Sequence, residues 1–408
     1  MEFQHAVLDN GLTVIGEVNR SVASMAAGFF VRTGSRDETA NVAGVSHFLE
    51  HMMFKGTARR TAFDVNRDFD RLGAQYNAFT SEENTVYFGA VLREFQTDLL
   101  DILGDILRPV LRQEDFDLEK NVIVDEIARY EDQPRFRLYE KLMAKSFRGH
   151  PLGNSVLGTP ESITALTRKD MLEYFERRYS PGNITVVVVG NLDWPAAIDK
   201  VGLMCSGWRP YEVSRELPPA PAPGAATSIV DAKLARQQVG MMSPAPSGQD
   251  DDRYAAHLAA TVLGDESGSR LFYALVEPAI ADEANLVYDP LDGVGAFLTL
   301  LSCNPDRAAE AVRIARGEFR RFLDDGPSEA ELLAAKNKIA SAATLKGELP
   351  MGRLTSVGFD WVYRKEYLPL AKEIDQYFAV TTEQALEVVR RYDLTAATVL
   401  SLGPAEVI

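Results

Sequence analysis

The sequence predicts an α+β protein made of two homologous domains, each with a mixed or antiparallel β-sheet and several long helices. Three observations lead to this prediction. A proline-rich stretch divides the 408-residue chain into two halves of about equal size. Both halves end in an amphipathic helix followed by an apolar strand, and both begin with two candidate strands followed by a helix. Because two copies are too few for a solenoid, the repeat indicates a duplicated domain.

The proline-rich stretch reads RELPPAPAPGAATS and covers residues 215–228. Proline fixes its own backbone and lacks an amide donor, so this stretch favours an extended tether over a helix or a sheet. We therefore expect an N-terminal metal-binding domain over residues 1–210 and a linker over 211–226. A homologous C-terminal domain without a metal site is expected over 227–408. Each half falls in the usual size range of a domain.

The repeated pattern is clearest at the ends of the halves. Residues 167–193 read TRKDMLEYFERRYSPGNITVVVVGNLD, and residues 381–406 read TTEQALEVVRRYDLTAATVLSLGPAE. In each, a polar start leads into a helix ending in Arg-Arg-Tyr, and an apolar strand then ends at a glycine. At the beginnings, GLTVIGEVN and SMAAGFFVRTGS are predicted to be paired strands, as are TSIVDA and RQQVGMMSP. Helices are predicted to follow at 42–55 and 253–264.

Composition and charge argue against several classes of function. The net charge of −16 disfavours nucleic acid and anionic membranes as partners. The longest apolar run, ITVVVV at 184–189, fits a buried strand and is too short to cross a membrane. The first residues lack a basic region and an apolar core, so we expect no secretory signal. Because Cys205 and Cys303 indicate no disulfide framework, we expect a cytoplasmic protein, with a periplasmic one as the alternative if the start is trimmed.

The stretch GVSHFLEHMMFKGT at 44–57 predicts a metal site on the first of these helices. His47 and His51 are four residues apart, so they share one helix face and could bind one small cation. Glu50 borders the same face and could take a proton from a metal-activated water. The H-x-x-E-H pattern is the inverse of the H-E-x-x-H motif of zinc proteases. The alternative, two histidines at the edge of a core helix, is less favoured, since such a match arises about once in a hundred chains by chance.

A hydrolytic zinc site needs a third protein ligand. The stretch DFDLEKNVIVDEIARYEDQP at 115–134 predicts a helix with Leu118, Val122, Ile123 and Ile127 as its apolar positions. Glu119 and Glu126 are seven residues apart and share a face of this helix. Glu126 is the candidate ligand and Glu119 its supporting carboxylate. For any single glutamate on a helix, a solvated position is the commoner alternative.

These residues resemble the pitrilysin family of zinc peptidases, which includes insulin-degrading enzyme and the mitochondrial processing peptidases. The resemblance to the processing-peptidase-like bacterial branch covers nearly the whole chain. The motifs that carry it are NGLTVI, HFLEHMMFKGT, GAQYNAFTSEENTVYF, EKNVIVDEI, GHPLGNSVLGTPESI, YSPGNITVVVVGN and GDESGSRLF. The resemblance implies one Zn²⁺ per chain held by His47, His51 and Glu126, with Glu50 as general base and Glu119 as supporting carboxylate. The spacing between His51 and Glu126 (126 − 51 = 75 residues) also fits the family.

The resemblance also implies how substrate is held. The stretch AQYNAFTS at 74–81 is expected to be an edge strand that binds a peptide by β-strand addition, with Asn77 and Ala78 as its best-matched positions. A residue at a turn or strand end is the alternative for Asn77.

The second half departs from the family pattern. Active members carry an Arg and a Tyr that stabilise the transition state, from the second half or from a partner chain. In SRLFYALVEPAIADEANLVYDPLDG, the Arg position holds Val276, and Tyr288 fits the Tyr position only with an insertion. We therefore expect a heterodimer with a homologous subunit that supplies the Arg/Tyr pair. A homodimer, or substitution by Arg270, is the alternative.

Three functions compete on these grounds. The first is a zinc endopeptidase subunit that cuts peptides or unfolded chains inside a closed dimeric chamber. The family's enclosure has four such domains, and this chain supplies two of them. The second is a non-catalytic structural subunit, like the core proteins of respiratory complexes. The third is a zinc-dependent binding or assembly protein without turnover. The complete set of ligand and base residues favours the first.

Overall fold

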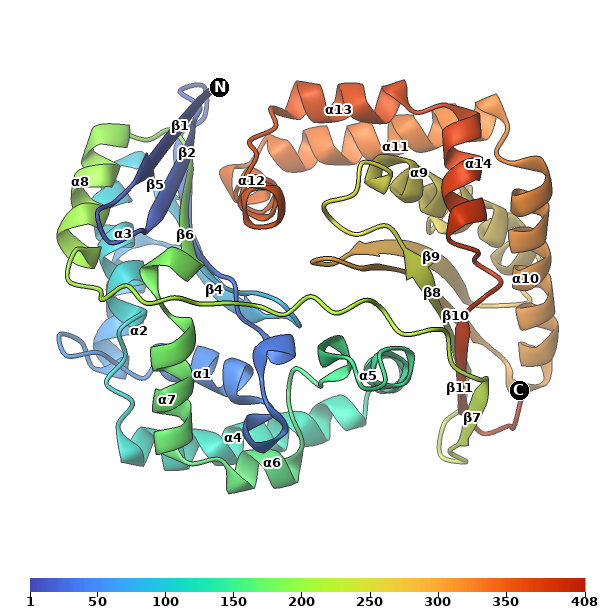
Figure 1. The fold of residues 1–408 in the computed structure, drawn as a ribbon, viewed down its shortest axis with the longest axis horizontal. Helices are drawn as coiled ribbons and strands as arrows, with labels where there is room; N and C mark the ends of the chain where they lie inside the picture. Colours follow the sequence, from blue (N-terminus) through green and yellow to red (C-terminus); the bar gives the residue numbers. More distant parts are fainter. Residues whose placement is uncertain (408) are drawn as a thin grey trace. The chain divides into compact units, whose positions relative to one another are not determined.

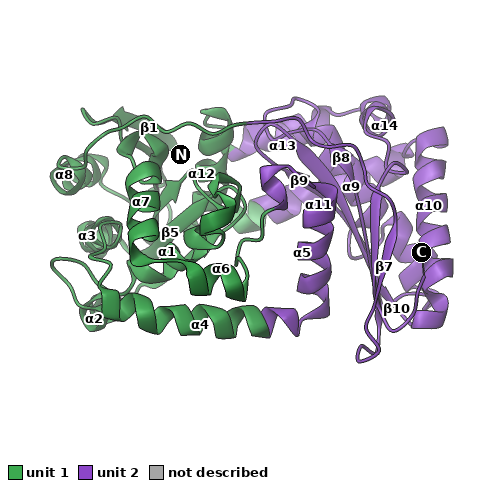
Figure 2. Ribbon diagram, turned by 60° about the horizontal axis from the view of Figure 1, so that its bottom comes forward, with its two compact units in different colours: residues 1–128, 154–216, 344–369 green, residues 129–153, 217–343, 370–408 purple. Residues whose placement is uncertain are grey.

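The computed structural model describes residues 1–407, which form two compact units (Figure 2). Unit 1 contains residues 1–128, 154–216 and 344–369, and unit 2 contains residues 129–153, 217–343 and 370–408. The units therefore differ from the halves of the sequence, because each takes in one segment of the other half. The domain boundaries expected from the sequence stay a prediction.

Unit 1 is built on a six-stranded mixed sheet of order β1-β2-β6-β3-β5-β4 (Figure 1). β2 and β6 run parallel, and the other neighbours run antiparallel. The strands are β1 (Glu2–Val7), β2 (Thr13–Val18), β3 (Ser24–Val31), β4 (Gln75–Thr80), β5 (Thr85–Leu92) and β6 (Ile184–Gly190). Because every residue of β6 is buried, this strand lies inside the sheet and not at its edge.

Unit 2 is built on a five-stranded mixed sheet of order β7-β11-β8-β10-β9. Its strands are β7 (Thr227–Val230), β8 (Gln237–Ala245), β9 (Glu283–Pro290), β10 (Gly295–Cys303) and β11 (Thr398–Gly403). Leaving out β1, the two sheets place equivalent strands in the same order. The predicted α+β fold with two homologous parts is therefore confirmed.

The predicted pairing of the opening strands is wrong in both halves. β6 lies between β2 and β3, and β11 lies between β7 and β8. Every residue of both closing strands is buried, and such strands are most stable where both of their faces are covered. The opening strands of each half pair with it from either side instead of with each other.

Helices surround both sheets. In unit 1 they are α1 (Val45–Met53), α2 (Ala62–Leu72), α3 (Gln96–Ile106), α6 (Pro160–Ala165), α7 (Arg168–Arg178), α8 (Trp194–Cys205) and α12 (Pro350–Arg364). In unit 2 they are α5 (Pro134–Ser146), α9 (Arg253–Gly264), α10 (Ala308–Asp325), α13 (Leu370–Ala379) and α14 (Thr382–Arg391). α4 (Gln113–Glu131) and α11 (Glu329–Gly347) each contribute residues to both units.

The two sequence halves exchange one helix each. α12, from the second half, packs on β3 and β6 of unit 1, where Leu354 and Val357 join the core. Its Arg353 is buried and donates to the Glu17 carboxylate of β2 over 3.0 and 2.7 Å. α5, from the first half, packs on β8 and β11 of unit 2. Each core is therefore completed by a helix from the other half of the sequence.

The apolar positions predicted for the helix at 115–134 are only partly correct. Ile123 and Ile127 are buried, but Leu118 and Val122 are exposed, at 69% and 44% of their surface. Phe116 takes the remaining core position and stacks on Phe48 of α1. This stacking joins α4 to the helix that carries the histidine motif.

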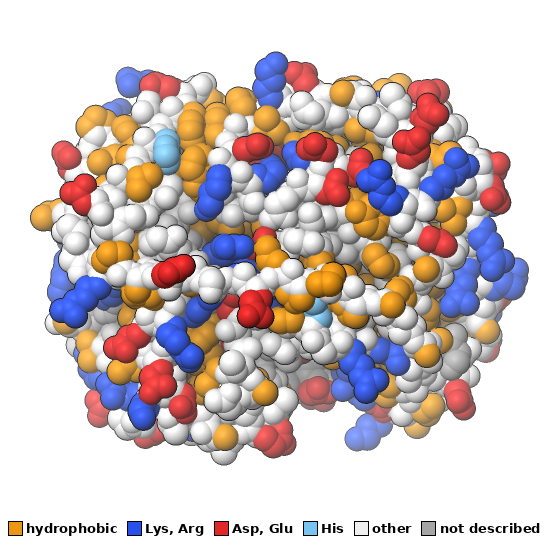
Figure 3. All heavy atoms as spheres, in the orientation of Figure 1, with side chains coloured by type: hydrophobic (Ala, Val, Ile, Leu, Met, Phe, Trp, Pro, Cys, Tyr) orange, Lys and Arg blue, Asp and Glu red, His pale blue; other side chains and the backbone are white. Residues whose placement is uncertain are grey.

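Residues 215–226 of the proline-rich stretch form neither a helix nor a strand, and its last two residues open β7. Among residues 1–407, none of the helices combines the length and the apolar character that a membrane span requires. On the face drawn in Figure 3, lysine and arginine side chains are interspersed with aspartate and glutamate.

Candidate metal centre

The position of α1 is set at its N-terminus by a buried carboxylate. Gly44 precedes the helix with a φ of +88°, and a Cβ there would lie 2.7 Å from the Leu157 carbonyl oxygen. The carboxylate of Glu38 accepts hydrogen bonds from the backbone N–H groups of Gly44 and Ser46, each over 2.7 Å. Burial raises the pKa of Glu38 to about 8, and the two backbone donors oppose this rise. Glu38 thus satisfies two of the free N–H groups at the start of the helix.

The apolar stripe of α1 is buried, which turns the motif residues toward α4. The buried stripe consists of Val45, Phe48, Leu49, Met52 and Met53. His47 and His51 follow one another on a single face, and their ring centroids lie 4.7 Å apart. Burial, followed by the charge of His51, lowers the pKa of His47 to about 3. His47 is therefore neutral, which is the form that ligates a metal.

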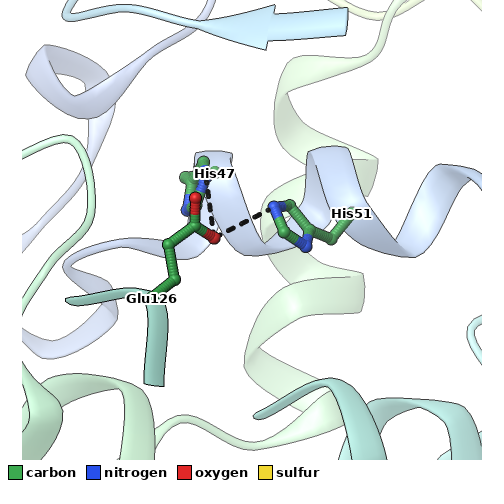
Figure 4. Close-up of side chains that lie close together, drawn as sticks. All are labelled: His47, His51 and Glu126. Atoms are coloured by element: carbon green, nitrogen blue, oxygen red, sulfur yellow. Dashed lines mark ion pairs between the residues drawn. The ribbon is translucent and has the colours of Figure 1, made fainter. Parts of the chain in front are cut away.

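α4 brings Glu126 to the two histidines (Figure 4). Its Oε2 atom lies 3.5 Å from Nε2 of His51 and 3.9 Å from Nε2 of His47. The three ligand atoms all lie within 4.8 Å of one another. Tetrahedral zinc, with bonds of about 2.0–2.2 Å, places its ligand atoms roughly 3.3–3.6 Å apart. The two imidazoles and one carboxylate therefore fit a single zinc ion after small side-chain shifts.

Glu119, which is paired with Lys55, fixes the ring of His51 on its Nδ1 side, away from Glu126. Oε1 of Glu119 lies 2.9 Å from Nδ1 of His51, and Oε2 lies 2.5 Å from Nζ of Lys55. Burial opposes ionisation of Glu119, but the hydrogen bonds from His51 and Lys55 outweigh it and hold its pKa below the usual range. The carboxylate therefore holds the proton of His51 at Nδ1 and leaves Nε2 free to face Glu126.

Glu50 lies on α1 beside the three candidate ligands and contacts β4. Its Oε2 atom accepts a hydrogen bond from the hydroxyl of Thr80 over 2.6 Å. Burial raises the pKa of Glu50 above its usual value, and the Thr80 hydroxyl and the charge of His51 partly offset the rise. A raised pKa suits a carboxylate that has to accept and release a proton near neutral pH.

Asn77 and Ala78 lie on β4, which packs against α1. β4 is the last strand of its sheet and pairs only with β5 among residues 1–407. Asn77 is exposed, and its Oδ1 atom accepts the Ala78 N–H over 2.9 Å. The strand therefore has an open edge beside the candidate metal centre.

The structure brings together all five motif residues predicted from the sequence, namely His47, Glu50, His51, Glu119 and Glu126. It adds three residues that sequence reasoning missed: Glu38, Lys55 and Thr80. Lys55 and Thr80 both lie within the motif stretches, but nothing in their spacing indicates a contact. Glu38 lies outside any motif, and only the folded chain shows that it reaches the start of α1.

The residues considered for an Arg/Tyr pair make hydrogen bonds within unit 2. Arg270 donates to the Glu331 carboxylate over 2.7 and 3.0 Å and to the Gly326 carbonyl over 2.7 Å. Tyr288 donates to the carbonyl oxygens of Pro246 and Ser247. Val276 closes a short π-helical turn at Phe272–Val276. Each of these side chains thus has a local role in the packing of unit 2.

Two family models match the sequence. "Insulinase (Peptidase family M16)" matches residues 13–160, and "Peptidase M16 inactive domain" matches residues 165–339. Among similar proteins, an "Uncharacterized zinc protease" of Mycobacterium leprae is 32% identical over 388 residues, covering 92% of this chain and 86% of the relative. A second, of Mycobacterium bovis, is 30% identical over 412 residues, covering 98% and 93%.

Solved structures share the fold along the whole chain. A protease from Helicobacter pylori has a TM-score of 0.91 at 21% identity and covers 99% of both chains. A peptidase M16 inactive domain from Pseudomonas fluorescens has a TM-score of 0.91 at 18% identity, covering 100% of this chain and 99% of that one. A chain of complex III2 from Candida albicans has a TM-score of 0.84 at 17% identity, covering 99% and 96%.

Proposed function

The chain belongs to the insulinase family of M16 zinc peptidases, and we propose that it is the zinc-binding subunit of an endopeptidase that hydrolyses peptides or unfolded chains. The observation that carries this proposal is the cluster of His47, His51 and Glu126, whose ligand atoms lie within 4.8 Å of one another beside the Glu50 carboxylate. Two imidazoles and a carboxylate leave one position of a tetrahedral zinc site open for a reacting group.

When bound, zinc would lower the pKa of water and polarise the scissile carbonyl. His47, His51 and Glu126 would hold the ion. Glu119 would keep the ring of His51 oriented through Nδ1. Glu50 would act as the general base, taking the proton from the attacking water and giving it to the leaving amine. Its Oε2 atom is engaged by Thr80, so Oε1 is the oxygen we assign to this transfer.

We further propose that substrate binds as an extra strand on the open edge of β4. The backbone of Ala78 faces this free edge and would supply hydrogen bonds, while the exposed side chain of Asn77 would lie beside the peptide. Such binding would favour extended peptides over folded proteins. The packing of β4 against α1 supports this proposal, because a peptide on that edge would pass close to the metal ligands.

The active dimer is proposed to be a heterodimer that encloses a chamber, in which a homologous subunit supplies the Arg/Tyr pair. The local hydrogen bonds of Arg270 and Tyr288 and the valine at position 276 support this division of labour. A homodimer is the alternative. We place the protein in the cytoplasm, where the free thiols of Cys205 and Cys303 would remain reduced.

The test is cleavage of a quenched fluorescent peptide library, with zinc content measured on the same sample. The chain would be assayed alone, with a homologous subunit from the same organism, and after chelation of the metal. We expect one zinc per chain and cleavage that requires both the metal and the partner. Zinc-dependent cleavage by the chain alone would contradict the heterodimer. Zinc binding without cleavage under any condition would favour a non-catalytic binding or assembly subunit.

Glu50→Gln is the matched variant for this test. It keeps all three candidate ligands and the size of the side chain but removes the base. We expect full zinc content and a loss of hydrolysis of about a hundredfold or more, since a general base contributes about 10²–10⁴ in rate. Retained hydrolysis in Glu50→Gln would contradict the mechanism.

A further inference from the structure

We propose that Thr80 is a positioning residue for the general base: its hydroxyl fixes one oxygen of the Glu50 carboxylate and leaves the other as the proton acceptor. The inference rests on the proposed function and assigns a role to a residue outside the metal ligands. It starts from the 2.6 Å hydrogen bond between the Thr80 hydroxyl and Oε2 of Glu50. Within residues 1–407, the Glu50 side chain makes no hydrogen bond besides this one.

Glu50 needs such a partner because of the length of its side chain. Glutamate has three rotatable bonds, and α1 fixes only the backbone from which they extend. A misplacement of about 1 Å in a reacting group can cost roughly a hundredfold in rate. A short hydrogen bond to a charged oxygen is among the stronger ones in proteins and is able to hold one conformation. The Thr80 hydroxyl therefore supplies the orientation that the helix does not.

Thr80 is able to act as a fixed point because the turn after it is firmly held. Thr80 faces Thr85 across the β4–β5 hairpin. In the turn, the N–H of Ser81 donates to the carbonyl oxygen of Asn84 over 2.8 Å. The N–H of Asn84 donates back to the Ser81 hydroxyl over 3.1 Å.

Buried side chains then anchor this turn to the rest of unit 1. Glu83 is 1% exposed, forms an ion pair with Arg36 and accepts a hydrogen bond from the Tyr363 hydroxyl over 2.7 Å. Arg215 donates to the Glu83 carbonyl over 2.5 Å. Because Tyr363 comes from α12, the exchanged helix also supports the end of β4.

The same contact links the base to the proposed substrate strand. Ala78 and Thr80 are two residues apart, so their side chains point to the same face of β4. A peptide added along β4 would stiffen the strand whose last residue holds Glu50. Thr80 would then align the base most firmly when substrate is present, and the effect of losing it should fall on kcat and not on KM.

The test compares Thr80→Val with Thr80→Ser. Valine keeps the branched shape but replaces the hydroxyl with a methyl group, whereas serine keeps the hydroxyl. We expect Thr80→Val to retain one zinc per chain and a KM within about twofold, while kcat falls about 10- to 100-fold. Thr80→Ser should restore kcat to within a few-fold of the parent value. Crystal structures of the zinc-loaded variants should show Glu50 displaced in Thr80→Val and in place in Thr80→Ser.

Thr85→Val is the matched control. Thr85 lies opposite Thr80 in the same hairpin and is buried. Its hydroxyl donates to the Thr33 carbonyl over 2.9 Å, whereas the Glu50 carboxylate is bonded to Thr80. We expect this variant to lower stability and to leave kcat within about threefold. It separates weakening of the hairpin from loss of the contact to the base.

Several outcomes would overturn the proposal. They are an unchanged kcat in Thr80→Val, an equal loss of kcat in Thr80→Val and Thr85→Val, and a loss of zinc in Thr80→Val. If the parent protein cleaves no peptide with or without its partner, the proposed function fails. The crystal structures then still decide the role of Thr80, because an unmoved Glu50 in Thr80→Val would overturn it independently of any activity.

Discussion

Helices α1 and α9 hold the same place in the two halves of the chain, after β3 and after β8, but they differ in chemistry. The triplet His47, Glu50 and His51 on α1 has the same spacing as His257, Ala260 and Thr261 on α9. His257 lies 2.8 Å from the Tyr377 hydroxyl through Nδ1, and burial lowers its pKa to about 4. The hydroxyl of Thr261 donates to the His257 carbonyl within the helix. The histidine that opens this triplet is thus a candidate metal ligand in α1, and in α9 it is a half-buried residue that contacts Tyr377.

The same contrast holds for α4 and α11, which both contain 19 residues. The seventh and fourteenth residues are Glu119 and Glu126 in α4, but Ala335 and Ala342 in α11. The eighth residue is a lysine in both, and each lysine donates to two carbonyl oxygens near the end of a later helix, α6 or α13. Lys120 bonds to Thr164 and Leu166, and Lys336 bonds to Phe378 and Val380. The two halves therefore share this lysine contact, and the candidate metal-site carboxylates are present in one half only.

The strongest way to break this comparison is to remove one histidine from each helix. We expect His51→Ala to lose zinc affinity by at least about a hundredfold, since even an outer-shell partner of a zinc ligand is worth about 10- to 100-fold. His257→Leu should keep one zinc per chain and should change only stability, because His257 makes its hydrogen bond within unit 2. Zinc content after dialysis, together with the thermal midpoint, measures both effects.

Glu126→Gln sharpens the same test. It keeps the shape of the third candidate ligand but removes its charge, so we expect reduced zinc occupancy. Full zinc retention in Glu126→Gln would show that another residue is the third ligand. Loss of zinc in His257→Leu would show that the second half also contributes to the metal site.

The sequence predicted the candidate site better than it predicted the packing around it. His47, Glu50 and His51 follow from helical spacing alone, because four residues make about one turn. Glu126 lies 75 residues further on (126 − 51), and only its resemblance to the family motif picked it out from the other glutamates of its helix. The roles of these residues stay predictions until zinc binding and hydrolysis are measured.

The order of strands and the exchange of helices did not follow from the sequence for a physical reason. Periodicity shows that a segment is buried, but not against which partner. β6 lies between β2 and β3, which come about 150 residues earlier in the sequence. Direct pairing of β2 with β3, which are close in sequence, was therefore the simpler expectation. In the same way, the apolar faces of α5 and α12 predict burial equally well in either unit.

The next prediction concerns the start of α1, where the carboxylate that accepts backbone N–H groups, Glu38, is buried. At the start of α9 the corresponding acceptor, Asp250, is only half-buried. Glu38 has its pKa raised to about 8, above the usual value of about 4.3 for glutamate. The folded state therefore binds the proton of Glu38 more tightly than the unfolded state does. The stability that the folded state gains from this proton is full at low pH and is lost as pH rises through about 8. Each pH unit in this window costs up to about 1.4 kcal/mol. We expect the thermal midpoint of the parent protein to fall more steeply between pH 6 and 8 than that of Glu38→Gln.

Asp252→Asn is the control, since Asp252 is the residue that directly precedes α9 and its side chain makes no hydrogen bond to the helix start. Its pH profile should follow that of the parent. Equal slopes in the parent and in Glu38→Gln would mean that Glu38 does not exchange its proton in this range.

The two lysines test whether the shared contacts are equivalent. Lys120→Met and Lys336→Met keep the length of the side chain but remove two charged hydrogen bonds to carbonyl oxygens. Because both ammonium groups are partly exposed, we expect each variant to lose about 1 kcal/mol of stability and to keep its zinc. Urea unfolding measures the stability of each variant, and a separate zinc assay measures its metal content. A much larger loss in one half would mean that the duplicated contacts have diverged in importance.

The smallest expected effect concerns Arg270 and tests whether this residue of the second half contributes to stability alone or also to catalysis. The hydrogen bonds from Arg270, together with those from Ser328, outweigh burial and lower the pKa of Glu331 to about 2. The stability that the ionised Glu331 carboxylate contributes is therefore present above about pH 4.5 and is lost as pH falls toward 2. We expect Arg270→Gln to lower the thermal midpoint slightly at neutral pH and to flatten its decline below pH 4.5, with zinc content and partner-dependent hydrolysis unchanged. If hydrolysis is lost while the acid-range stability profile stays the same, Arg270 is a catalytic arginine, and the division of labour between chains has to be abandoned.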